Sequence, residues 1–279
     1  MSVTKAFTAA REQGRAVLVG YLPAGFPDVD TAITACRAMV EAGVDVVEVG
    51  MPYSDPVMDG PVIQAAADRA LSRGVRIRDL LRTVEAVAAT GAPTLVMTYW
   101  NPIVQYGVDA FARDLAAAGG AGLITPDLIP DEADEWLAAS DTYALDRVFL
   151  VAPSSTDARL AMTAAACRGF VYATSVMGVT GARQRTSEAA PVLVSRVREV
   201  TTLPVGVGLG VSNGDQAAEV AGYADGVVVG SALVRRLLDA DDAGDLSAGI
   251  TAVADLAADL AAGVRRPAHR SAEGVLGNA

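Results

Sequence analysis

An acidic residue stands in the middle of an otherwise apolar, strand-like run. The run Val44–Gly50 reads VDVVEVG, and the two-residue period of a strand puts Glu48 on the same face as Val46 and Gly50. A carboxylate inside a buried strand is costly unless it is paired or its pKa rises. Two interpretations follow: a structural acid held in a salt bridge, or a general acid/base that faces a pocket.

A second carboxylate follows in the next loop. The segment Met51–Pro61 reads MPYSDPVMDGP, and its three prolines and one glycine restrict its conformation. Asp59 could reach from this loop over the pocket that Glu48 faces, although an Asp before a Gly is also common in purely structural turns. The two acids together are candidates for acid–base chemistry.

Three glycine-rich junctions late in the chain suit an anion. They are Gly178–Ala182, Gly208–Ser212 and Gly230–Ala232. Glycine lets the backbone approach an anion closely, and the N-terminus of a helix offers unpaired N–H groups. Turn glycines with Ser212 and Ser231 as helix N-caps are the structural alternative. Their succession favours a small phosphorylated ligand.

Composition narrows the class of protein. The 279 residues are 52% hydrophobic and 20% charged, and the formal net charge is −11, which argues against binding to nucleic acid or to anionic membranes. The one histidine, His269, and the two separated cysteines, Cys36 and Cys167, support no metal site and no disulfide framework. With no signal-peptide pattern and no long apolar run, we expect a cytoplasmic protein without a membrane span.

Short apolar runs alternate with Ala-rich helical stretches along most of the chain. Buried parallel strands read as such runs, and eight repeats predict a single-domain α/β fold, a (β/α)8 TIM barrel over residues 1–264 with a flexible tail over 265–279. A doubly wound open sheet is the alternative. In a barrel, functional residues lie where strands end. The runs begin at Ala16, Val44, Pro93, Ala121, Arg147, Gly169, Leu203 and Ala224.

The segment Val47–Gln64, VEVGMPYSDPVMDGPVIQ, closely resembles the signature of the tryptophan synthase α subunit family. Further matches occur in order between Tyr21 and Val234: YLPAGFPD, MTYWNPI, PDLIPDE, SVMGVTGAR, VGLGVS and VVGSALV. The resemblance implies a (β/α)8 barrel, a lyase of tryptophan biosynthesis that cleaves indole-3-glycerol phosphate to indole and glyceraldehyde 3-phosphate.

The resemblance also implies roles for individual residues. Glu48 matches the catalytic acid/base, and Asp59 matches the second catalytic carboxylate, beside the indole N–H. Tyr21 stands where the family commonly has Phe, so its hydroxyl needs a partner in the pocket. Substrate or phosphate contacts match Tyr172, Thr180, Gly181, Gly210, Gly230 and Ser231, and pocket or supporting positions match Tyr21, Ile63, Tyr99 and Asp127.

A partner follows from the same resemblance. The family docks on a β subunit that holds pyridoxal phosphate, in an α2β2 heterotetramer, and indole passes between the two sites; this chain itself needs no cofactor and no metal. We expect the contact face around Pro52–Met58 and Trp100–Tyr106, with an exposed apolar patch. The alternatives are a stand-alone lyase, a catalytically idle activator of the β subunit, or another phosphate-sugar barrel.

Overall fold

Eight short parallel strands close into a barrel. The structure, a computed structural model, describes residues 2–174, 189–208 and 210–266. Strands pair in chain order and the last pairs with the first, so the predicted (β/α)8 barrel is confirmed and the open sheet is wrong. The strands are β1 (Val17–Pro23), β2 (Val46–Gly50), β3 (Thr94–Met97), β4 (Gly122–Thr125), β5 (Asp146–Val151), β6 (Val171–Thr174), β7 (Val205–Gly208) and β8 (Gly226–Val229).

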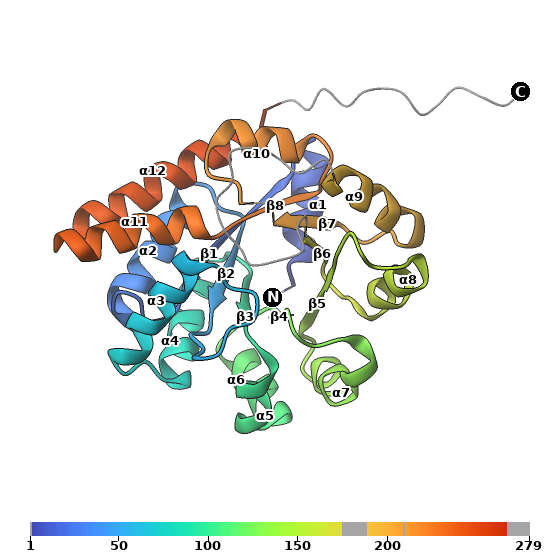
Figure 1. Cartoon of the computed structure of the whole chain (residues 1–279), viewed down its shortest axis with the longest axis horizontal. Helices are drawn as coiled ribbons and strands as arrows, with labels where there is room; N and C mark the ends of the chain where they lie inside the picture. Colours follow the sequence, from blue (N-terminus) through green and yellow to red (C-terminus); the bar gives the residue numbers. More distant parts are fainter. Residues whose placement is uncertain (1, 175–188, 209, 267–279) are drawn as a thin grey trace, which may run out of the picture.

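Helices surround the strands (Figure 1). Their apolar stripes face the barrel; in α4, for example, Leu80, Val84 and Val87 are buried at helical spacing. The helices are α1 (Thr4–Glu12), α2 (Val29–Glu41), α3 (Pro61–Ser72), α4 (Ile77–Ala88), α5 (Trp100–Tyr106), α6 (Val108–Ala117), α7 (Asp134–Thr142), α8 (Asp157–Ala166), α9 (Ala189–Val200), α10 (Gly214–Ala221), α11 (Ser231–Ala243) and α12 (Leu246–Val264), with a 3-10 turn η1 (Pro130–Glu132).

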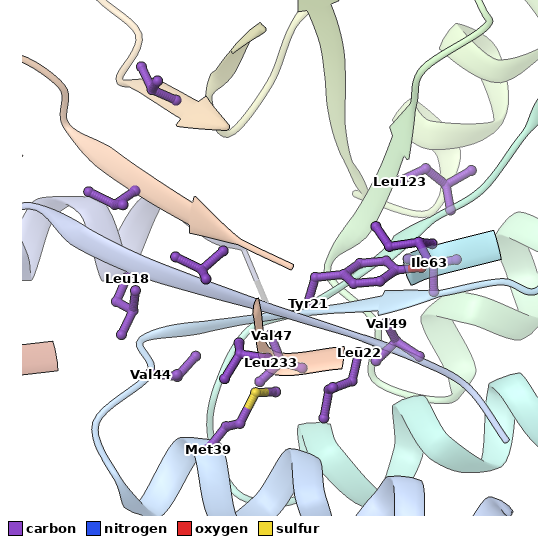
Figure 2. Packing of buried hydrophobic residues seen from close by; sticks show 14 of the residues in the cluster. Leu18, Tyr21, Leu22, Met39, Val44, Val47, Val49, Ile63, Leu123 and Leu233 are labelled. Atoms are coloured by element: carbon purple, nitrogen blue, oxygen red, sulfur yellow. The ribbon is translucent and has the colours of Figure 1, made fainter. Parts of the chain in front are cut away.

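The strands are buried on both faces, which explains their nearly continuous apolar sequences. One face looks outward: in Figure 2, Leu22 and Val47 lie on the side of the β1–β2 pair that meets Met39 of α2. The other face fills the barrel, where Phe170 packs on Phe7 of α1 with 5.3 Å between the ring centroids. Because α1 closes the N-terminal end of the barrel, the end open to chemistry is the one where the strands finish.

The last helix, α12, is long and apolar enough to cross a membrane by length and composition alone, and it is the one such helix in the described part of the chain. It packs instead against α2, α10 and α11, with Leu260 fully buried. It is therefore a core helix. Arg265 and Arg266, which follow it, contact the Gly43 carbonyl and the Asp215 carboxylate. The predicted tail beyond them, residues 267–279, lies outside the described residues.

One turn holds a residue type that its backbone disfavours. Ala144, which follows α7, has φ 54°, in the left-handed region where a Cβ is strained. We expect Ala144→Gly to raise the free energy of unfolding by about 1 kcal/mol in urea titrations, since glycine adopts this conformation without strain. The matched change Ala118→Gly, at a C-cap with φ −72°, should lower it. Equal effects of the two substitutions would contradict the strain.

Candidate active site

Glu48 lies inside the barrel near the end of β2, and its side chain faces the same interior as Val46. The residue is 2% exposed, and its Oε2 has no hydrogen-bond partner among the described residues. Burial, followed by the nearby charge of Asp59, raises the pKa of Glu48 to about 8. The causes of this pKa shift include no basic group, so the described residues do not support a salt-bridged structural acid.

Asp59 is held over the same end of the barrel by Tyr99. The Tyr99 hydroxyl accepts a hydrogen bond from the Met58 amide at 3.0 Å and donates one to the Asp59 carboxylate. Burial raises the pKa of Asp59, while the hydrogen bond from Tyr99 acts in the opposite direction. The Tyr53 ring packs on Tyr99, with 5.2 Å between centroids, and fixes the loop further. The two predicted acids therefore come together, in unlike surroundings.

Two tyrosines lie across the mouth of the barrel, each over a glycine of the next strand. A Cβ added to Gly50 would overlap the Tyr21 hydroxyl, and one added to Gly208 would overlap the Tyr172 hydroxyl. The charge of Glu48 contributes to the raised pKa of both tyrosines. The glycines thus open the slots in which these rings lie close to the acid.

Asp127 and Ile63 support the site rather than carry charge into it. Asp127 follows β4 and accepts hydrogen bonds from the Trp100 amide at 2.9 and 3.1 Å, so it caps α5 directly after Tyr99. Ile63, on the first turn of α3, is 7% exposed, and Figure 2 shows the Tyr21 ring pointing toward it. The supporting roles that the resemblance implies for these two residues stay predictions.

The N-terminus of α10 has its own acceptors. Gly214 N donates to Asp259 Oδ2 at 2.7 Å, Gln216 N to Asn213 Oδ1 at 2.9 Å, and Ser212 N to Gln216 Oε1 at 2.8 Å. The N-cap is Asn213, so the alternative that made Ser212 the cap is wrong. Amides already bonded in this way are not available to an anion.

The N-terminus of α11 differs. Its N-cap, Gly230, supplies no side-chain acceptor, and the described residues give the amides of Ser231 and Ala232 no partner. Ser231 is buried, and Gly210, with φ +71°, follows the neighbouring strand β7. Both junctions contain no Lys, Arg or His in sequence. Of the residues predicted to bind the phosphate, Gly210, Gly230 and Ser231 lie at the mouth of the barrel. Thr180 and Gly181 lie outside the described residues.

The described site thus combines two acids, the three tyrosines Tyr21, Tyr99 and Tyr172, and the N-terminus of α11, which has no side-chain cap. Among the described residues, no group of three or more His, Cys, Asp or Glu side chains is placed to hold a metal ion. Sequence patterns alone do not single out Asn213 as a cap. For Gly50 and Gly208, a glycine on the inward face of a strand is the signal in the sequence for a slot that receives a neighbouring side chain.

Comparisons with known proteins point to one family. The chain matches the model of one protein family, described as "Tryptophan synthase alpha chain", over residues 7–263. Curated relatives with that name include one from Salinispora tropica, 72% identical over 263 residues (94% of this chain, 97% of the relative), and one from Mycobacterium avium, 63% identical over 265 residues (95% of each).

Solved structures show the same likeness. A Mycobacterium tuberculosis tryptophan synthase structure has a TM-score of 0.88 and 59% identity, covering 94% of this chain and 98% of the other. The tryptophan synthase subunit alpha of Legionella pneumophila has a TM-score of 0.83 and 30% identity, covering 95% and 98%.

The raised pKa of Glu48 predicts how stability depends on pH. The folded chain holds this proton up to about pH 8, whereas the unfolded chain releases it near pH 4.3, so the free energy of unfolding falls as pH rises between these values. We expect Glu48→Gln to be roughly 2–5 kcal/mol more stable than the parent at pH 9 and nearly equal to it at pH 4, in urea titrations. Glu199→Gln, on the exposed surface, is the control. If the free energy of unfolding depended on pH in the same way in the parent and in Glu48→Gln, the raised pKa of Glu48 would be contradicted.

Proposed function

The chain belongs to the tryptophan synthase alpha chain family, and from that premise we propose how its residues divide the reaction. It is a lyase that cleaves indole-3-glycerol phosphate to indole and glyceraldehyde 3-phosphate. The cleavage is a retro-aldol reaction. C3 of the indole gains a proton, the adjacent hydroxyl of the side chain loses one, and the bond between the two carbons breaks. The hydroxyl carbon becomes the aldehyde.

Glu48 can serve both proton transfers. With a pKa of about 8 it is mainly protonated near neutral pH, so it gives its proton to C3 and becomes a carboxylate. That carboxylate then takes the proton of the substrate hydroxyl, which returns Glu48 to its first state. The observation that carries this role is a buried carboxyl with an unpartnered oxygen at the mouth of the barrel.

Asp59 serves as the ionised partner. When C3 is protonated the indole nitrogen becomes positively charged, and a fixed carboxylate beside the N–H lowers the energy of that cation. The Tyr99 hydrogen bond both orients Asp59 and favours its charged form. Unlike surroundings thus separate the roles of two neighbouring carboxyl groups, as acid–base pairs require.

The phosphate of the substrate is anchored at α11. The uncapped amides of Ser231 and Ala232, the helix dipole, and the open backbone at Gly210 and Gly230 suit a phosphate without a basic side chain. Thr180 and Gly181 complete this set in our proposal, and Tyr172 contacts the substrate beside Glu48. The reaction draws on no cofactor in this chain.

The apolar face beside the site is the proposed docking surface for a tryptophan synthase β subunit, which holds pyridoxal phosphate, in an α2β2 assembly. Val57 is 68% exposed, Val104 49% and Tyr106 37%, all within the two predicted segments, and Ile129 adds to them at 41%. The side chain of Asn101 reaches Tyr53 at 3.3 Å and links the two segments.

Both cysteines are buried and free, which suits a cytoplasmic location.

The first test replaces each acid by its amide, which has nearly the same shape but cannot exchange a proton or carry a negative charge. Glu48→Gln should abolish detectable cleavage, and Asp59→Asn should lower kcat by about 10²–10⁴-fold, because both lose groups that act in the transition state. Indole release is the measurement, and binding of glycerol phosphate by calorimetry is the control that should persist. Turnover by Glu48→Gln at the parent rate would remove Glu48 from the role.

A second test concerns the phosphate anchor. Ser231→Asp puts a carboxylate on the uncapped N-terminus of α11 and should weaken binding of glycerol phosphate by about 100-fold through like-charge repulsion. Asn213→Asp adds the same charge to α10, where the amides are already bonded, and should weaken binding by less than about threefold. Equal losses in the two variants, measured by calorimetry, would contradict the assignment of the phosphate to α11.

A third test concerns the docking surface. Val57→Asp and Val104→Asp should each weaken binding of the β subunit by about 10–100-fold, since a charge is brought into a desolvated contact. Val192→Asp is the matched control, because Val192 is 60% exposed on α9, which lies away from α5 in Figure 1. Sedimentation with the β subunit gives the affinity, and indole release with and without it separates a stand-alone lyase from a partner-dependent one. A loss for Val192→Asp as large as for the other two would contradict this surface.

A further inference from the structure

The Tyr21 hydroxyl occupies a defined place beside the acids. Tyr21 is the register partner of Glu48 across the β1–β2 pair, so the two side chains point into the barrel from neighbouring strands. Its hydroxyl lies over Gly50, the next inward residue of β2, and its ring lies against Gly230. Figure 2 shows the ring pointing toward Ile63. The Tyr21 side chain therefore lies between Gly50 and Gly230, with its hydroxyl over Gly50.

The titratable groups that face Tyr21 come from four other segments. They are Glu48 on β2, Asp59 in the loop after it, Tyr99 after β3 and Tyr172 on β6. Burial and these neighbours raise the pKa of Tyr21 well above its ordinary value, so the phenol stays neutral and remains a donor. The causes of this pKa shift include no hydrogen bond to the Tyr21 hydroxyl. Glu48 Oε2 has no hydrogen-bond partner among the described residues either.

The other tyrosines of the mouth cannot take the same place. The Tyr99 hydroxyl is already bonded to the Met58 amide and to Asp59. The Tyr172 hydroxyl lies over Gly208 on the β7 side, and among the acids its pKa responds to Glu48 and not to Asp59. Tyr21 is thus the described tyrosine with a free hydroxyl that faces both acids.

We propose that Tyr21 is a positioning residue for the acid pair, whose neutral hydroxyl donates a hydrogen bond to Glu48 or Asp59 when the two are ionised together. This rests on the proposed function in one respect: that doubly charged state arises when Glu48 has given its proton to the substrate. Two neighbouring carboxylates in a dry site repel each other, and a fixed donor lowers the energy of the pair. The hydroxyl holds its own proton throughout.

The test compares Tyr21→Phe with Tyr223→Phe. The second variant removes a buried hydroxyl that has no partner, on the turn between α10 and β8, and leaves the site intact. The chain is labelled with ¹³C at the Glu and Asp carboxyl carbons, and the Glu48 and Asp59 signals are assigned with Glu48→Gln and Asp59→Asn. Carboxyl shifts are then followed against pH by NMR, without substrate.

We expect Tyr21→Phe to raise the pKa of the acid that ionises second, by roughly half a unit or more, because a hydrogen bond to the doubly charged pair is lost. The same variant should lower kcat about tenfold while KM changes less than about twofold. Tyr223→Phe should leave both titrations and kcat at the parent values. Since the titration needs no turnover, it remains decisive even if the chain fails to cleave indole-3-glycerol phosphate.

Two results would overturn the proposal. Unchanged titrations of Glu48 and Asp59 in a folded Tyr21→Phe variant would show that the hydroxyl does not bond to the acids, whatever happens to kcat. A rise in KM alone, with kcat at the parent value, would mean that Tyr21 only shapes the pocket for the substrate.

Discussion

The burial of one carboxyl group inside the barrel is the constraint on which the site depends. Glu48 sits on the inward face of β2 with a free oxygen, and the described residues place no cation beside it. In such surroundings the charged form is disfavoured, so the proton is held to about pH 8. The same burial lowers the free energy of unfolding at high pH. It also keeps Glu48 protonated near neutral pH, so the group that our proposal uses as the proton donor is also one that costs stability.

The barrel keeps the groups around this acid different from one another. Asp59 accepts a hydrogen bond from Tyr99 and is less completely buried than Glu48, so its carboxyl group ionises more readily than that of Glu48. On the far side, α10 bonds its own first amides while α11 leaves its amides uncapped. Of these two helices, α11 is therefore the one whose first amides suit an anion, which is why our proposal anchors the phosphate there.

Individual elements show which features of the structure can be predicted from the sequence. The eight strands were predictable because buried parallel strands are apolar on both faces, and the motif from Val47 to Gln64 identified both acids. The sequence allows Ser212 as the cap of α10, but Asn213 is the cap, because two neighbouring residues of this turn are both of a type that caps helices. The bonding of Gly214 to Asp259 spans 45 residues and had no local signal.

Local patterns and one continuous motif are enough to predict the class of fold, the family and the residues that could carry charge. The three-dimensional arrangement shows the rest: Glu48 lacks a counter-charge among the described residues, Gly50 and Gly208 make room for Tyr21 and Tyr172, and α11 rather than α10 has open amides. Each of these depends on what a neighbouring strand or helix brings to the same point, and such contacts join residues far apart in the chain.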